Sequence, residues 1–403
     1  MAPTTRSRGV AVDGVPIYTI DLSRPPALRY IDVVSDFRHK IPRLTELFGD
    51  VVTMASLPLK PTTRLAKLLM TRLHSKEQTE ELRGISEASG VDMYLLVCMN
   101  VLLDLFMGCT SGGARVGMKG AGDSKGTRML HFRTLDWAME PLREVVVQLN
   151  FVNETDGPVI ARSITYVGFV GVLTAVRPGL SMSLNFRPYH NNNHSRVSNF
   201  KFNYHRLLVL LGWRTSIAAT MRDLLLQSSS GNDDKHVDTL TSIQQRLPSV
   251  PSTAAYMTFN DGDRAMVMEK DRVTAHTSTS SSFIVVTNHD ASSDSDPAAS
   301  ANDGDSAKLA PTGMVELIED SHNRKECIES KWKKAAAAFR RRSKNSRRDK
   351  EDTAVSVTAS ELIKWVEACP TTNECTHFAT IMDPVAGDFV YLRRYLEPVT
   401  VTE

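Results

Sequence analysis

Cysteine is scarce in this sequence, and charges of the two signs nearly balance. The five cysteines are scattered over 403 residues and none stands in a CxxC pair, which argues against a disulfide-built scaffold and against a common zinc site. The chain has 48 Lys and Arg residues against 46 Asp and Glu residues, and a net charge of +2 argues against a protein that mainly neutralises nucleic-acid phosphates. We expect no metal site and no nucleic-acid partner.

Long hydrophobic runs are also missing. The longest one, Met93 to Met107, is shorter than the ~20 residues that span a bilayer, and it contains Asn100 and Asp104. It therefore predicts a buried helix. The N-terminus carries basic residues with no apolar stretch after them, so we expect no secretory signal.

The apolar pattern divides the chain near residue 108. Residues 16–30 alternate like a short strand that Pro25 and Pro26 stop, and apolar residues at three-to-four spacing predict helices from there to Phe106. From Cys109 a Gly-rich stretch predicts a turn, and the β-branched segments that follow predict antiparallel strands. This order of elements indicates an α+β fold.

Helices and strands alternate again towards the C-terminus. Residues 202–245 and 315–342 have helical spacing, while strands are predicted in AAYMTFND, RAMVMEKD, SSFIVVTNHD, HFATIMD and FVYLRRYLE. Polar sequence near residues 291–310 and 343–353 predicts two flexible insertions. The chain from Cys109 onward is thus predicted to be a β-rich unit with two solvated loops.

Cys109 stands at the change from helix to strand, where a side chain can be presented in a cleft. An isolated cysteine is more often a small buried hydrophobic residue than a nucleophile. His131 is the one histidine close to it in sequence, so the usual Cys–His pairing is not evident. Position alone leaves both interpretations of Cys109 open.

Several separated motifs in order are more specific. MGCTS, HFRTLDW, ITYVGFVGVLTAVRPGLSMSLNFR and VVTNHD, with VPIYTIDLSRPPALRY near the N-terminus, resemble the acid ceramidase and N-acylethanolamine acid amidase family of N-terminal-nucleophile hydrolases. The resemblance implies an αββα sandwich of two antiparallel sheets between helices. Residues 1–108 would form a mostly helical precursor segment or α-subunit, and residues 109–403 the catalytic domain.

In this family the chain cuts itself before the nucleophile, which here implies cleavage of the Gly108–Cys109 bond. The freed α-amino group, with an ordinary pKa of ~7.7 to 8.0, then serves as general base for the thiol of its own residue. Arg133 and Asp136 match the family's paired arginine and aspartate, which would favour the thiolate and hold the α-amino group. Positions three apart in a strand point to opposite faces, so both reach the site only if the strand bends or ends there.

Two further residues complete the implied catalytic set. Asn288 matches the family's asparagine, whose amide would donate to the oxyanion, although a residue at a strand end can equally form a turn. Arg324 in EDSHNRKEC is the closest match to the family's last arginine, and a surface arginine facing Asp320 is the alternative. No metal or organic cofactor is implied.

The substrate side rests on four residues. Tyr166 and Phe169, in a strand–turn–strand, would line an acyl-chain channel, although most apolar residues there belong to a core. Asn185 and Phe186 follow in SLNFR, and Phe186 stands where relatives carry a glutamate. That difference puts recognition of the substrate head group, or assistance to cleavage, in doubt.

The resemblance implies hydrolysis of N-acyl lipids, with ceramide cut to a sphingoid base and a fatty acid. The alternatives are an N-acylethanolamine amidase, an amide-forming acyltransferase on a specialised metabolite, and an inactive lipid-binding relative. The two fragments would stay associated after cleavage. The family implies a lysosome, a vacuole or secretion, whereas no secretory signal is expected at the N-terminus, so a location inside the cell is also open.

Two charged segments are candidate contact surfaces. The helix predicted in residues 63–73 has apolar residues on one face and Arg64, Lys67 and Arg72 near the other, as in a helix that rests on an anionic membrane. Such a helix more often packs on the body with its charges solvated. The basic run from Lys331 to Lys350 has the same two interpretations, a phosphate-binding patch or a solvated helix.

Overall fold

The computed structural model describes residues 14–40, 49, 52, 58–102, 108–118, 126–188, 190, 195–226, 239–291, 314–345 and 354–399. The insertion predicted near residues 291–310 lies almost wholly outside the described residues, and most of the one near 343–353 does as well. The last long helix runs on to Asn345, so the beginning of that second insertion is helical.

The larger of two β-sheets has eight strands. In spatial order these are β1 (Ile17–Asp21), β4 (Val146–Val152), β5 (Val159–Tyr166), β6 (Thr174–Arg177), β7 (Leu180–Phe186), β8 (Ala255–Asn260), β9 (Ala265–Lys270) and β10 (Ala275–Ser280). Neighbouring strands are antiparallel except for β1, which pairs with β4 in parallel. The prediction of antiparallel sheets is therefore wrong at this one edge, where the N-terminal segment joins a strand from beyond Cys109.

The smaller sheet has five strands and contains Cys109. Its spatial order is β11 (Phe283–Val286), β2 (Gly108–Gly117), β3 (Thr127–Asp136), β12 (Thr376–Asp383) and β13 (Asp388–Arg394). All four pairings are antiparallel. The sheet thus joins strands from three distant parts of the sequence, and this brings residues near 110, 135, 288 and 376 together.

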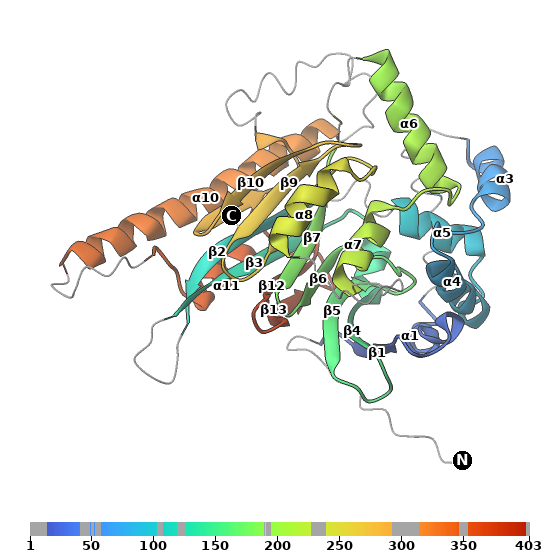
Figure 1. Cartoon of the computed structure of the whole chain (residues 1–403), viewed down its shortest axis with the longest axis horizontal. Coiled ribbons are helices and arrows are strands. Elements are labelled where there is room, and N and C mark those ends of the chain that lie inside the picture. The colour runs from blue at the N-terminus through green and yellow to red at the C-terminus, as the bar shows by residue number, and fades with distance from the viewer. Residues whose placement is uncertain are drawn as a thin grey trace.

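The two sheets pack face to face, and helices cover their outer faces (Figure 1). Strands β2 and β3 contact β7, β8 and β9 across the interface. Helix α7 (Ile217–Leu226) packs on β5, β6 and β7, while α10 (Met314–Asn345) and α11 (Ala359–Glu367) pack on the smaller sheet. This is the predicted α+β fold, an αββα sandwich.

The remaining helices lie mostly at one end of the sandwich (Figure 1). They are α1 (Ile31–Asp36), α3 (Leu59–Leu69), α4 (Lys76–Ser89), α5 (Met93–Leu102), α6 (Arg196–Leu210) and α8 (Leu240–Arg246), with short 3-10 helices at Pro26–Leu28, Glu140–Val145 and Leu247–Ser249. Gly90 ends α4 in the left-handed conformation, with φ of 76°, as glycine commonly does after the last turn of a helix. No helix among the described residues is long and apolar enough to cross a membrane.

Gly112, Gly113 and Gly117 lie inside β2 and not in the predicted turn. Neighbouring atoms approach closely at two of them, from β11 of the same sheet at Gly112 and from β9 of the other sheet at Gly113. A Cβ on Gly112 would lie 2.2 Å from Ile284 O, and a Cβ on Gly113 would lie 2.4 Å from Ala265 Cβ. The glycines are therefore needed for strand packing, a use that local sequence does not distinguish from a turn.

Candidate active site

Cys109 is the second residue of β2 and is completely buried. Its backbone N–H donates to Asn288 Oδ1 at 2.8 Å, and Arg133 Nη2 lies 3.4 Å from its thiol sulfur as a donor. Burial raises the pKa of the thiol, whereas Arg133 opposes that effect. In the uncut chain the thiol is thus held in its neutral form beside a guanidinium that favours the thiolate.

Gly108, on the other side of the predicted cleavage bond, lies opposite Asp136 in the register of β2 and β3. A Cβ at Gly108 would lie only 3.3 Å from Asp136 Cβ, so a larger residue would crowd the carboxylate. The cleavage bond is therefore next to the acidic residue of the set.

Arg133 and Asp136 both reach the site because β3 ends at Asp136. The neighbouring strand β12 has a register irregularity at this point, between Thr376 and Phe378. Residues three apart in a regular strand point to opposite faces, but here the strand ends and its pairing is irregular, so Arg133 and Asp136 can both face the site. The guanidinium of Arg133 also donates to Leu184 O at 2.8 Å.

Asp136 is buried and asymmetrically bound. Its Oδ1 accepts a hydrogen bond from Thr376 Oγ1 at 2.7 Å, while Oδ2 lies 3.5 Å from Arg324 Nη1. Among the described residues, Oδ2 has no hydrogen-bond partner. Burial raises the pKa of this carboxyl to about 6, against the opposing effects of Arg324 and Thr376. An unfilled acceptor is thus present beside Cys109.

Asn288 follows β11 and is bound at both ends of its amide. Its Oδ1 accepts from Cys109 N and from Arg324 Nη2 at 3.0 Å, and its Nδ2 donates to Phe186 O at 2.8 Å. Two donors at one atom identify that atom as the amide oxygen. The turn-former interpretation is therefore incomplete, because the side chain is hydrogen-bonded to two strands, β2 and β7, and to helix α10.

Arg324 is completely buried on α10 and belongs to the same cluster. Its Nη1 donates to Cys109 O at 2.6 Å and to Thr110 Oγ1 at 3.0 Å. Its Nε donates to Asp320 Oδ2 at 2.8 Å, one helical turn away. The interpretation as a surface arginine is therefore wrong, although Arg324 does pair with Asp320. Its catalytic role stays a prediction.

The four residues predicted on the substrate side differ in their surroundings. Tyr166 and Phe169 are buried in the main core, and the Tyr166 hydroxyl lies 2.8 Å from His377 Nδ1. Asn185 Oδ1 accepts from Arg133 Nη1 at 3.0 Å. Phe186 is almost buried, and its backbone carbonyl accepts the amide of Asn288. Asn185 and Phe186 thus support the cluster, and a lining role for Tyr166 and Phe169 stays a prediction.

Sequence analysis missed Ser321 and Thr376. The buried Ser321 Oγ accepts from Asn288 N at 2.7 Å, and Thr376 Oγ1 donates to Asp136. Ser321 lies three residues before Arg324 on α10, so helical periodicity would have placed it on the same face. Thr376 had no local signal, because its role depends on the pairing of β12 with β3.

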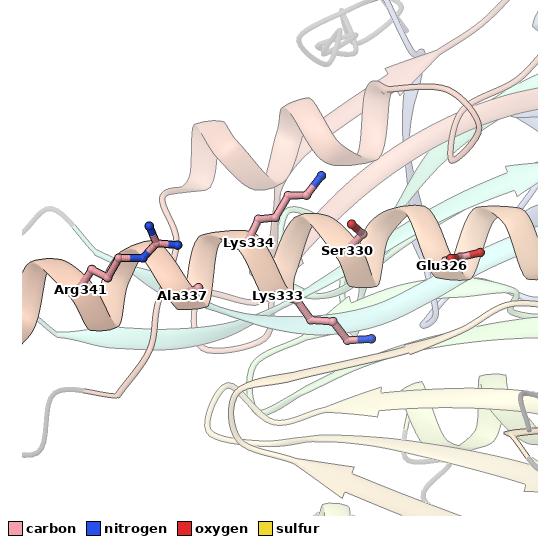
Figure 2. A pocket seen from close by; sticks show the side chains of 6 residues that line it. All are labelled: Glu326, Ser330, Lys333, Lys334, Ala337 and Arg341. Atoms are coloured by element: carbon pink, nitrogen blue, oxygen red, sulfur yellow. The ribbon is translucent and has the colours of Figure 1, made fainter.

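The described part of the basic run, residues 331–345, lies on the second half of α10. A hollow of about 490 Å³ runs along this helix (Figure 2), and its described lining consists of Glu326, Ser330, Lys333, Lys334, Ala337 and Arg341. At 1.5 Å per residue, Arg341 lies about 25 Å along the helix from Arg324. The lining begins at Glu326, two residues after Arg324, so the hollow starts about 3 Å along the helix from the cysteine cluster and extends away from it. Among the described residues, no group of three or more His, Cys, Asp or Glu side chains is placed to hold a metal ion.

This chain is similar to known proteins in two ways: a family model matches its N-terminal residues, and longer stretches of it align with curated relatives. Residues 13–74 match the family model described as the beta subunit of N-acylethanolamine-hydrolyzing acid amidase. The Caenorhabditis elegans N-acylethanolamine-hydrolyzing acid amidase is 32% identical over 181 residues, which are 42% of this chain and 47% of that protein. Mouse acid ceramidase is 28% identical over 194 residues, 43% of this chain and 46% of that protein.

These matches make the chain similar to acid ceramidase and N-acylethanolamine acid amidase. The matched stretches span about half the length of these curated relatives. The family model is described as a beta subunit, although the residues it matches precede Cys109. Residues 1–108 are therefore named the N-terminal segment. A solved structure of the C. elegans N-acylethanolamine-hydrolyzing acid amidase ortholog aligns with 69% of this chain and 93% of its own, at 20% identity and a TM-score of 0.43.

Proposed function

We propose that this protein hydrolyses the amide bond of N-acyl lipids, with Cys109 as nucleophile after the chain is cut between Gly108 and Cys109. The observation that carries the proposal is the pair of contacts on Cys109, whose backbone nitrogen is bound by Asn288 and whose thiol is bound by Arg133. A residue held through both atoms suits a reaction in which the nitrogen removes the proton of the sulfur.

Cleavage would supply the general base. Before the cut, the nitrogen of Cys109 is an amide without basicity, and burial keeps the thiol pKa raised. After the cut, the α-amino group has a pKa near ~7.7 to 8.0 and can take the thiol proton. The ammonium so formed would add a hydrogen bond to Asp136 Oδ2, the acceptor that has no hydrogen-bond partner among the residues that the structure describes.

In the proposed reaction the thiolate attacks the amide carbonyl carbon and a C–S bond forms. The carbonyl oxygen becomes an oxyanion, to which the second N–H of the Asn288 amide donates. Collapse of this intermediate breaks the C–N bond, and the leaving amine takes the proton from the α-ammonium group of Cys109. Water then attacks the thioester, which releases the fatty acid and restores the thiol.

A membrane surface is the proposed source of substrate. Helix α3 exposes Leu65 and Leu68, at 56% and 73%, and α6 exposes Phe200 at 70%. Both helices contact α5, which leads towards Cys109. Lys60 and Arg64 on α3 are exposed and add positive charge to this helix, while Lys67 pairs with Asp92 at 3.0 Å. Apolar side chains with cations nearby are typical of a helix that lies in a lipid interface.

Ceramide is the substrate we propose first, and N-acylethanolamine is the second. Each buried methylene of an acyl chain adds ~0.8 kcal/mol to binding, so the shared acyl chain can dominate affinity for both. Phe186 lies beside Asn288, and we expect contacts there with the amine part of the substrate to distinguish ceramide from N-acylethanolamine. An acyltransferase would share the thioester and differ only in the acceptor.

The deciding experiment follows the chain and the products together. Wild type, Cys109→Ala and the control Cys98→Ala are incubated at acidic and neutral pH, then analysed by intact mass and N-terminal sequencing. Cys98 is also buried but lies in the apolar core of α5. We expect a fragment beginning at Cys109 from the wild type and the control, and none from Cys109→Ala.

Mass spectrometry of products from ceramides and N-acylethanolamines, with and without an added amine, then identifies the reaction. Free fatty acid supports hydrolysis, whereas a new amide supports acyl transfer. A wild-type chain that stays uncut and releases no fatty acid under any condition contradicts the proposal and favours the inactive lipid-binding alternative.

A further inference from the structure

Thr376, the first residue of β12, presents a buried hydroxyl to Asp136. Its Oγ1 accepts a hydrogen bond from Asn373 N at 2.9 Å and lies 2.7 Å from Asp136 Oδ1. An ionised carboxylate can only accept, and a threonine hydroxyl has one proton to give. The geometry therefore directs the single hydroxyl proton at Asp136.

The position of Thr376 is itself maintained by Arg143. This guanidinium is completely buried and donates to the backbone carbonyls of Glu374, Thr376 and Tyr395. Its Nε pairs with Glu140 Oε2 at 2.9 Å. A planar group with five donors suits several carbonyls at once. Arg143 thus ties the beginning of β12 to the chain that follows β13.

We propose that Thr376 is a positioning residue that orients Asp136 and leaves Oδ2 as the oxygen open to the nitrogen of Cys109. The hydroxyl occupies Oδ1, so rotation of the carboxylate would break a charge-assisted hydrogen bond. The kinetic part of this inference rests on the proposed function, while the orientation of Asp136 does not. The hairpin of β12 and β13 then contributes to the active site through the side chain of Thr376.

Loss of this hydroxyl has a defined effect on protonation. Asp136 faces Arg324 and Asp320 from α10, Arg133 from its own strand, and the thiols of Cys109 and Cys375. Burial raises its pKa to about 6, and the Thr376 hydrogen bond acts in the opposite direction. Without the hydroxyl the pKa of Asp136 rises further. The carboxylate is then lost at a higher pH, and the acidic limb of activity moves upward.

The test compares Thr376→Val with Thr376→Ser in the full chain. Thr372→Val is the matched control, because the Thr372 hydroxyl is also buried in this turn but donates to Val366 O. We expect Thr376→Val to move the acidic limb of kcat/KM up by about one pH unit and to lower kcat at least tenfold with KM within about twofold. Thr376→Ser should restore both values, and Thr372→Val should change neither.

A second readout does not need turnover. Carbon NMR of labelled aspartate in the Cys109→Ala chain, with Asp136→Asn to assign the signal, measures the pKa of Asp136 directly. A higher pKa in Thr376→Val than in Thr372→Val supports the inference even if the wild type hydrolyses nothing, a result that would contradict the proposed function alone. An unchanged pKa overturns the inference. If Thr376→Val does not fold, Thr376→Ala replaces it under the same criteria.

Discussion

Asn288 Oδ1 accepts a hydrogen bond from the backbone nitrogen of Cys109, a residue 179 positions earlier in the sequence. The contact follows from strand pairing. In the antiparallel pair β11 and β2, Val286 lies opposite Ser111, and the same register carried two residues further brings Asn288 opposite Cys109. The arrangement puts the proposed oxyanion donor and the proposed base on neighbouring strands, so small shifts of β11 should affect both cleavage and hydrolysis.

Asn288→Ala should lower kcat for lipid amide hydrolysis ~100-fold to 1000-fold, because one oxyanion donor is lost. It should also slow the cut before Cys109, since the nitrogen there loses its acceptor. Steady-state kinetics and intact mass measure the two effects. Asn260→Ala is the control, because Asn260 is equally buried but donates to Met129 O. Equal losses in both variants would contradict a specific role for Asn288.

Glu81→Gln should loosen the N-terminal segment from the rest of the chain. Glu81 is buried and binds Arg29 of its own segment and Arg222 of α7. Removal of the carboxylate leaves the buried Arg222 without its counter-charge and Arg29 with Glu77 alone, at a cost of ~3–5 kcal/mol. Size-exclusion chromatography of the cut protein should then show separated fragments.

The control for that experiment is Glu77→Gln, one helical turn earlier. Glu77 also contacts Arg29, but its side chain is 47% exposed, so its charge is largely solvated. Fragments that stay together equally well in Glu81→Gln and Glu77→Gln would show that β1 pairing and apolar contacts alone hold them.

A Leu65→Glu, Leu68→Glu double variant should reduce binding to vesicles at least tenfold. Two exposed leucines on α3 become charged, and transfer of a charge into the interface is unfavourable. Co-sedimentation with vesicles of neutral and anionic phospholipid measures the change. Val390→Glu, an exposed apolar residue of β13, is the control. If Val390→Glu weakens binding as much, α3 does not form the membrane surface.

Acidification should destabilise the sandwich through His131. This histidine is buried between Ser181 Oγ and Ser183 Oγ, at 3.0 and 2.8 Å, and burial lowers its pKa from 6.5 to about 3. A depressed folded pKa means that this stability is complete above pH 6.5 and is lost as pH falls towards 3. The pKa difference of about 3.5 corresponds to roughly 5 kcal/mol over that range.

Urea denaturation between pH 7.5 and pH 4 measures the effect. His131→Gln should flatten the pH dependence of the unfolding free energy, whatever its stability at pH 7.5. His276→Gln, at an exposed site, should leave the slope unchanged. A slope that is equal in wild type and His131→Gln would remove His131 as its source. Asp136 acts in the opposite direction, because its raised pKa favours the folded state at low pH.

Local sequence was sufficient for much of the architecture. Apolar periodicity predicted most helices and strands, and Gly90 marked the end of α4. Apolar periodicity did not predict the polar edge strand β10, because its sequence, AHTSTS, lacks the alternating apolar residues that identify a strand. Helix α11 was also missed, although Thr358 and Glu361 form a capping box that a search for the spacing would have found.

The candidate residues could be named from the sequence because MGCTS, FRTLD and VTNHD resemble motifs of a known family. How these residues meet follows from the tertiary structure. Arg324 pairs with Asp320 on its own helix and also donates a hydrogen bond to the carbonyl of Cys109. Thr376 lies beside Asp136 because of the irregular pairing of β12 with β3. These contacts depend on strand order and register across hundreds of residues, which local patterns do not encode because hydrogen bonding between strands is a property of the whole sheet.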